Sequence, residues 1–347
     1  MDDQERRKNR IKGTIIAGAC GDACGMPYEG LKKHQIEEYY GTVTAKYRDS
    51  EYSYHTKGLP KGSYTDDTQL TLATIEAILD FDFEEEVVRH WGDLSDHVSN
   101  QVLAEKIGHY FVKLYKNKQL IGAGRATKLA LKEALKGTSP VESGLKDAYG
   151  CGAAMRISPI ALMPLEEIPD QGRSLLELTC LVVQITHNST VGLNSAFLVS
   201  SMIKHLLRES SDEALNVEEL LSLACKMAAD FDDDTQFSVA SKIKENAPHI
   251  HESIDELADR IGTSGLATES VVLALFAFLK EPRDFEQLMI SCVRNGGDTD
   301  SIASIAGNFF GALNGFSAIP LKYVINLQDS QKIQERVDKF AESLTNE

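Results

Sequence analysis

Ser63-Tyr64-Thr65-Asp66-Asp67-Thr68 and Gly296-Gly297-Asp298-Thr299-Asp300-Ser301 are two acidic segments of similar design near opposite ends of the chain. Each places two carboxylates and neighbouring hydroxyls directly before an apolar pattern with helical spacing. One such segment alone is well explained by acids that cap and solvate a helix N-terminus. Finding two favours a site for a divalent cation, because close carboxylates repel one another, and ligand sets made only of oxygen select Mg²⁺ or Mn²⁺.

Helical periodicity extends along most of the chain and predicts an all-α fold. Apolar or small residues recur at 70, 73, 77, 78 and 81, and again at 302, 305, 306, 309, 310 and 313. The best candidate for a strand is the short, polar segment Val43–Tyr54. Glycine and proline breakers are spread evenly, and no linker divides the chain. A site built from both acidic segments would unite the whole chain, so we expect one domain of ten or more helices. Further helical patterns cover residues 127–135, 175–185, 191–207, 220–229 and 270–279.

Composition excludes several classes of protein. The chain has 347 residues, 42% of them hydrophobic and 25% charged, as is typical of a globular protein. Its net charge of −16 argues against a surface that binds nucleic acid. The longest apolar run, Val271–Leu279, is too short to span a membrane, and the mixed-charge start Met1–Lys8 is not a signal peptide. The six cysteines lack CxxC spacing, which indicates buried free thiols and a cytoplasmic location.

Four other segments carry candidate functional residues. In Gly18–Glu29, small residues allow close helix packing, Pro27 ends the helix, and Glu29 is a better chemical candidate than Asp22, which we interpret as a buried, hydrogen-bonded carboxylate. Gly122–Thr127 and Gly150–Arg156 are glycine-rich turns that open helices and could offer N–H groups to a phosphate, although ordinary turns look the same. His187 ends a helix, where either a structural or a ligand-binding role fits. Asp232–Gln236 echoes the first acidic segment without the apolar helix, so we interpret it as a solvated loop.

Taken in order along the chain, these segments resemble the ADP-ribosylglycohydrolase family, which includes dinitrogenase-reductase-activating glycohydrolase. No single motif is decisive, but the ordered set is highly specific and covers about residues 11 to 315. Weaker similarity extends over 122–131 and 262–279. The matching motifs are Gly21-Asp22-Ala23 with Pro27-Tyr28-Glu29, Thr65-Asp66-Asp67-Thr68, Gly150 with Gly152-Ala153-Ala154-Met155-Arg156, Thr186-His187, and Gly296-Gly297-Asp298-Thr299-Asp300.

The resemblance implies an all-α, single-domain orthogonal bundle with two Mg²⁺ (or Mn²⁺) ions in a central cleft. The domain would cover residues 11–347, after a polar extension at 1–10. Glu29, Asp66 and Asp67 become candidate catalytic residues, and the choice of general base among them stays open. His187 would contact the distal ribose or a phosphate. The implied metal ligands are Thr65, Asp66, Asp67, Asp298, Asp300 and Ser301. The implied substrate-binding residues are Gly122, Gly124, Gly150, Cys151, Gly152, Met155 and His187.

The implied reaction is hydrolysis of the bond between ribose C1″ and a modified protein side chain. Arginine-linked ADP-ribose is the first expectation, and a serine linkage, O-acetyl-ADP-ribose or another N-glycoside are alternatives. The implied partners are an ADP-ribosylated protein and, in a protective role, an ADP-ribosylating toxin or transferase. Two rivals remain, a non-catalytic ADP-ribose-binding relative and a metal-dependent phosphohydrolase that uses the same acids.

The chain departs from the family pattern at three positions. Ser301 stands where threonine is usual, which keeps the hydroxyl, and Cys151 stands where asparagine is common. Leu120-Ile121-Gly122 stands where several arginine-specific relatives carry Asp-Ile-Gly, and this third departure puts the linkage in question.

Overall fold

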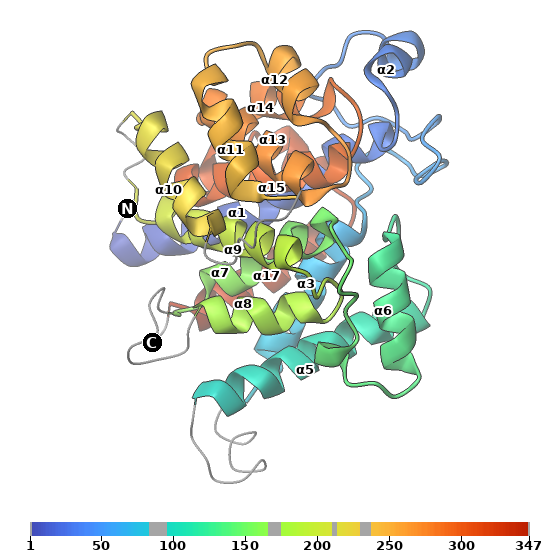
Figure 1. Cartoon of the computed structure of the whole chain (residues 1–347), viewed down its shortest axis with the longest axis vertical. Helices are drawn as coiled ribbons and strands as arrows, with labels where there is room; N and C mark the ends of the chain where they lie inside the picture. Colours follow the sequence, from blue (N-terminus) through green and yellow to red (C-terminus); the bar gives the residue numbers. More distant parts are fainter. Residues whose placement is uncertain (1, 83–95, 166–174, 210–213, 230–236, 346–347) are drawn as a thin grey trace.

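The computed structural model describes residues 2–82, 96–165, 175–209, 214–229 and 237–345. These residues form helices and connecting loops with no β-strand, which confirms the all-α prediction (Figure 1). Asp232–Gln236, predicted to be a solvated loop, lies outside the described residues. The α-helices are α1 (Asp3–Gly25), α2 (Lys33–Tyr40), α3 (Asp66–Leu79), α5 (Asp96–Lys116), α6 (Arg125–Leu135), α7 (Ser158–Leu162), α8 (Leu175–Gln184), α9 (Thr190–Leu206), α10 (Val217–Ala229), α11 (Val239–Asn246), α12 (Ile254–Ile261), α13 (Ala267–Lys280), α14 (Phe285–Val293), α15 (Thr299–Asn314), α16 (Leu321–Asn326) and α17 (Ser330–Ser343).

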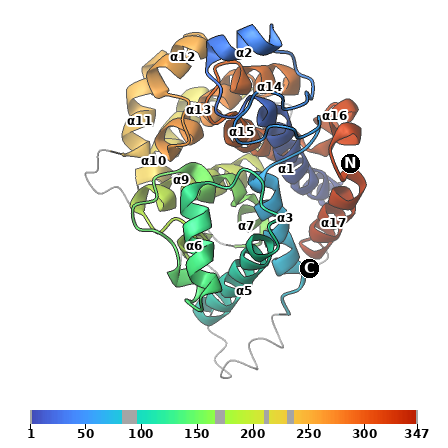
Figure 2. The same cartoon turned by 90° about the vertical axis from the view of Figure 1, so that its right-hand side faces the viewer.

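Helices α1 and α15 form the centre of the bundle, with α11 to α14 on one side and α3, α5 and α8 on the other (Figures 1 and 2). The contact between α1 and α15 is made of small residues. A Cβ at Gly21 would lie 2.1 Å from the carbonyl oxygen of Ala303, and a Cβ at Gly311 would lie 2.1 Å from that of Gly13. Only glycine permits backbones this close. The small residues expected to allow tight packing therefore join the N-terminal helix to the C-terminal half of the chain.

The end of α1 meets the beginning of α15 through the same close approach. Gly25, the last residue of α1, lies against Thr299, the first residue of α15, and the Thr299 hydroxyl donates to the Gly25 carbonyl oxygen at 2.8 Å. Residues that follow α1 and residues that begin α15 are thereby neighbours, although some 270 positions separate them in the sequence.

Val43–Tyr54, the best candidate for a strand in the sequence, does not form one. The segment is a series of bends, turns and loops. Ser50 Oγ and Thr56 Oγ1 are 2.8 Å apart, and the Thr56 hydroxyl also donates to the carbonyl oxygen of Met26. Such side-chain bonds compete with a sheet ladder, and the described residues contain no strand that could pair with this segment.

Most of the segment predicted as a polar extension, residues 1–10, is helical. Residues 3–10 form the first turns of α1, and the buried Arg10 donates hydrogen bonds to the carbonyl oxygens of Leu206 and Leu207.

The longest apolar run of the sequence lies inside the fold. Val271–Leu279 is buried within α13. Over the described ranges, no helix has the length and apolar content that crossing a membrane requires.

Candidate functional site

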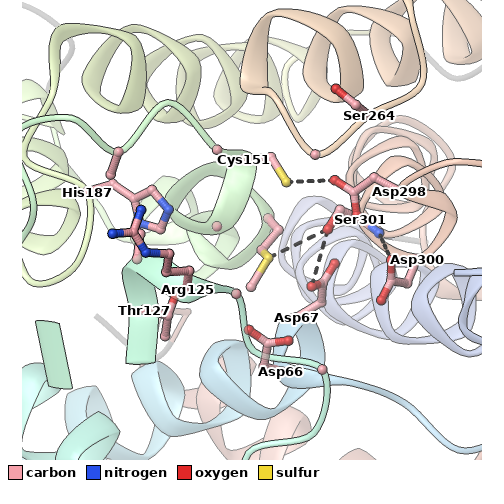
Figure 3. Close-up of a pocket in the computed structure, with 18 of the residues that line it drawn as sticks. Asp66, Asp67, Arg125, Thr127, Cys151, His187, Ser264, Asp298, Asp300 and Ser301 are labelled. Carbon is pink, nitrogen blue, oxygen red and sulfur yellow. Dashed lines mark hydrogen bonds between the residues drawn. The ribbon is translucent and has the colours of Figure 1, made fainter. Parts of the chain in front are cut away.

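The acidic segments from both halves of the chain line one cavity of about 560 Å³. Figure 3 shows Asp66, Asp67, Asp298 and Asp300 on one side of it, with His187 across from them. The sequence-predicted residues on its walls are Glu29, Asp66, Asp67, Gly122, Gly124, Gly150, Cys151, Gly152, Met155, His187, Asp298, Asp300 and Ser301.

Thr65 is the one predicted site residue that does not line the cavity, and Asp22 explains its position. The buried Asp22 carboxylate accepts bonds from the backbone N–H and the hydroxyl of both Thr65 and Thr68, at 2.6–3.1 Å. A carboxylate of α1 therefore caps the N-terminus of α3, in place of the Thr65 side chain. Asp22 is the buried, hydrogen-bonded acid that the sequence predicted, and it fixes Asp66 and Asp67 against α1.

The glycine pair before α15 positions Asp298 beside Glu29. Gly30 N–H donates to the Gly297 carbonyl oxygen at 2.9 Å, and Gly297 N–H donates to the Leu31 carbonyl oxygen at 2.8 Å. Gly297 has φ +86°, and a Cβ there would lie 1.9 Å from the carbonyl oxygen of Thr263. Only glycine fits this turn, which joins the loop after α1 to the start of α15.

The acids of the cavity are close to one another. Carboxylate oxygens of Glu29, Asp298 and Asp300 lie within 4.8 Å of one another. Ser301 Oγ lies 3.5 Å from Asp67 Oδ1, which joins the α3 acids to the α15 acids. Glu29 Oε2 and Asp67 Oδ2 are buried oxygens that find no hydrogen-bond partner among the described residues.

This crowding changes the acidity of the carboxyl groups. Burial raises the pKa of Glu29, Asp66 and Asp67 well above the usual range, and the charge of Asp300 raises each further. Burial and Asp300 likewise raise the pKa of Asp298 to about 7. Without a cation, the cluster therefore favours holding protons.

The donor set fits divalent metal ions. Unpaired buried oxygens and repelling carboxylates are what a bound cation would satisfy, and the ligand atoms are carboxylate and hydroxyl oxygens, as Mg²⁺ and Mn²⁺ prefer. Arg156 is buried and attracts Asp66 and Asp67, but one guanidinium cannot balance so many acids. Cys151 adds a neutral contact, since burial raises the pKa of its thiol and its Sγ donates to Asp298 Oδ2 at 2.9 Å.

The opposite wall suits an anion. Helix α6 begins there at Arg125 after Gly124, so its free N–H groups and positive dipole end face the cavity. Gly122 has φ +81°, and a Cβ there would lie 3.3 Å from Asp66 Oδ1, so the loop can pass close to the acids only with glycine. The His187 ring packs against Gly152, where a Cβ would lie 2.7 Å from Cε1.

Sequence reasoning did not select several residues of the cavity wall. Arg125 could have been found, because a cation directly follows a glycine in a candidate phosphate-binding turn. His55, Tyr149 and Ser264 lie in loops without a recognisable pattern, and only the fold brings them to the site.

Comparison with known proteins agrees with this geometry. The family model described as ADP-ribosylglycohydrolase matches residues 3–347. An uncharacterised protein of Archaeoglobus fulgidus is 28% identical over 96% of this chain and 97% of its own length. Human ADP-ribosylhydrolase ARH3 is 25% identical over 98% of this chain and 93% of its own. A solved structure titled "ADP-ribosylglycohydrolase-related protein complex" superposes with a TM-score of 0.69 at 25% identity, over 97% of this chain and 98% of that one. The chain therefore belongs to the ADP-ribosylglycohydrolase family of enzymes.

Proposed function

We propose that this enzyme uses two bound Mg²⁺ or Mn²⁺ ions to release ADP-ribose from an oxygen-linked acceptor, a serine side chain or an acetyl group. The observation that best supports this proposal is that one wall of the cavity is acidic and the opposite wall suits an anion. ADP-ribose has the matching form, with a reactive ribose at one end and a diphosphate farther along. The family is metal-dependent and acts on ADP-ribosylated substrates, which supports the proposal.

The acidic wall would bind the metal ions, and the opposite wall would bind the diphosphate. Bound divalent ions would supply positive charge that orients the ribose hydroxyls and acidifies a water molecule. The metal ligands would be Asp66, Asp67, Asp298, Asp300 and Ser301. Thr65 would be a further ligand if its hydroxyl turned from Asp22, to which it now donates, toward the metal.

The chain's own groups would bind and position the substrate. The α6 N-terminus with Arg125, and the backbone at Gly122 and Gly152, would hold the diphosphate. Positive charge develops on the sugar as the bond to the acceptor breaks, and the Glu29 carboxylate, beside Asp298 and Asp300, would stabilise that charge. The general base would be one of Glu29, Asp66 and Asp67, which all line the cavity.

Leu120 supports an oxygen linkage over arginine. In the family resemblance, several arginine-specific relatives carry an aspartate at this point, and a carboxylate there could pair with a guanidinium. Here the partly buried Leu120 packs against the hydrophobic core, next to a loop that Gln69 holds by a bond to the Ile121 N–H at 2.9 Å. The arginine linkage, expected first from the sequence, is the second candidate, because the Glu29 carboxylate could still pair with a guanidinium.

The partner of the enzyme in this proposal is an ADP-ribosylated protein. An ADP-ribosyltransferase must have attached the modification, and a toxin of that class would make the enzyme protective. A search for the modified target would use a metal-ligand variant as a trap, because that variant should bind without releasing ADP-ribose.

The test is a substrate panel with mass analysis of the products. Serine-linked and arginine-linked ADP-ribosyl peptides and O-acetyl-ADP-ribose would each be incubated with Mn²⁺ or with excess chelator. We expect intact ADP-ribose from the oxygen-linked substrates, only with metal, and none from the Asp300→Asn variant. Asp259→Asn, an exposed acid of α12 away from the cavity, is the matched control.

Three outcomes would contradict the proposal. Release of AMP or phosphate would indicate a phosphohydrolase. ADP-ribose binding without turnover of any substrate would indicate a binding protein. Faster release from the arginine peptide would contradict the proposed preference for an oxygen linkage, but the enzyme would still be an ADP-ribose hydrolase.

A further inference from the structure

A buried arginine lies behind the His187 wall of the cavity. Arg156, in the 3₁₀ segment Cys151–Arg156, is fully buried, and its guanidinium stacks over the Phe111 ring at 5.0 Å. One of its nitrogens donates to the Gly152 carbonyl oxygen, and Nη2 donates to Thr186 Oγ1 at 2.7 Å. A guanidinium has only donors, so Thr186 Oγ1 must be the acceptor in this bond.

This bond determines the direction of the next one. Thr186 Oγ1 lies 2.7 Å from His187 Nδ1, and both residues are buried. A hydroxyl carries a single proton. Among the described residues, His187 Nδ1 is the only acceptor within reach of the Thr186 hydroxyl. If the hydroxyl donates to Nδ1, then Nδ1 carries no proton and the imidazole proton must be on Nε2.

The other ring nitrogen faces the cavity. A Cβ at Gly152 would lie 3.0 Å from His187 Nε2, and a Cβ at Gly150 would lie 3.7 Å from it, so the ring edge lies over the glycine turn. His187 is a wall residue of the cavity, and Nε2 makes no hydrogen bond within the described part of the chain. Burial, with the charge of Arg156, lowers the pKa of His187 to about 3, so the ring is neutral at physiological pH.

We propose that Arg156 and Thr186 are positioning residues that hold His187 as the neutral tautomer with its proton on Nε2. His187 then donates a hydrogen bond into the cavity and accepts none there. Its partner is an oxygen acceptor such as a phosphate oxygen of ADP-ribose, a ligand whose identity rests on the proposed function. The tautomer itself is a property of the resting protein and does not depend on that function.

The direct test is ¹⁵N NMR of the imidazole nitrogens of His187 in the full-length protein without ligand, assigned by comparison with His187→Phe. We expect Nδ1 to resonate as an unprotonated nitrogen and Nε2 as a protonated one, without change between pH 6 and pH 8. A protonated Nδ1, or a mixture of the two tautomers, would overturn the proposal whether or not the protein hydrolyses any substrate.

A second measurement uses binding of ADP-ribose by calorimetry. Thr186→Val removes the hydroxyl at nearly constant volume, which leaves Nδ1 without its donor. We expect the Nδ1-protonated form to appear in the NMR spectrum and ADP-ribose to bind about 10-fold more weakly. Thr186→Ser should restore both properties.

Thr179→Val is the matched control, because Thr179 is equally buried on α8 and its closest hydroxyl partner, Ser200, is 3.5 Å away. It should leave the His187 spectrum and ADP-ribose binding unchanged. If Thr186→Val also leaves both unchanged in a folded protein, Thr186 does not position His187.

Discussion

The substitution Gly25→Ala tests the helix contact that brings the acids together. Gly25 has an ordinary helical φ of −78°, so alanine introduces no backbone strain. Its Cβ would lie 2.2 Å from the Thr299 carbonyl oxygen, whereas ordinary contact begins at 3.4 Å. The first turn of α15 must therefore move by about 1 Å, and Asp298 and Asp300 move with it.

A displacement of this size should be costly to catalysis. Misplacement of catalytic groups by 1 Å can lower a rate by about 100-fold. We expect kcat for release of ADP-ribose to fall by about that factor, with weaker Mn²⁺ binding by calorimetry. Overpacking should also lower the free energy of unfolding by about 1–3 kcal/mol.

Gly108→Ala is the control that separates an effect on stability from a displacement of the cavity acids. A Cβ at Gly108, in α5, would also meet an atom at 2.2 Å, here the Pro140 Cβ, but neither residue lines the cavity. This variant should lose similar stability and keep its Mn²⁺ affinity and rate. If Gly25→Ala hydrolyses substrate at the wild-type rate, or if both variants lose activity equally, the Gly25–Thr299 contact does not set the geometry of the acids.

Three further predictions concern the acids and the glycine turn. Because the pKa of Asp298 is raised to about 7 in the metal-free fold, its stabilising contribution is complete below pH 4 and is lost as the pH rises through 7. The Tm in chelator should therefore fall from pH 5 to pH 8, while the stabilisation by Mn²⁺ should grow; a flat Tm in chelator would contradict this. Asp67→Asn removes a buried carboxyl whose ionised form is opposed by burial and by the charge of Asp300, so we expect a higher metal-free Tm above neutral pH, together with at least a 100-fold loss of hydrolysis; retained activity would show that catalysis does not need Asp67. Gly297→Ala places a Cβ 1.9 Å from the Thr263 carbonyl oxygen at φ +86°, so we expect unfolding in less urea and weak Mn²⁺ binding, and a wild-type unfolding midpoint would show that the turn adapts.

The helical fold was predictable because its signals are local. The starts of α3 and α15 coincide with the acidic segments, since an apolar period of three to four residues follows each one. The small residues of Gly18–Gly25 also indicated close packing, but periodicity alone could not identify α15 as the partner helix.

The parts that sequence reasoning missed depend on contacts between distant residues. The Thr65 side chain could have capped its own helix, and only the fold shows that Asp22 of α1 does so instead. Val43–Tyr54 has an alternating pattern, but the part of the chain that the structure describes holds no strand to pair with it, and no local pattern reveals this. His55 and Tyr149 reach the cavity from loops whose course is set by packing elsewhere.

The most direct test of the account is anomalous diffraction from crystals grown with Mn²⁺. We predict two manganese peaks per chain in the cavity, bound by oxygens of residues from α3 and α15, including Asp67 and Asp300, and lost in Asp300→Asn. A map with no manganese between these two helix ends would contradict the claim that distant parts of the chain form one metal centre.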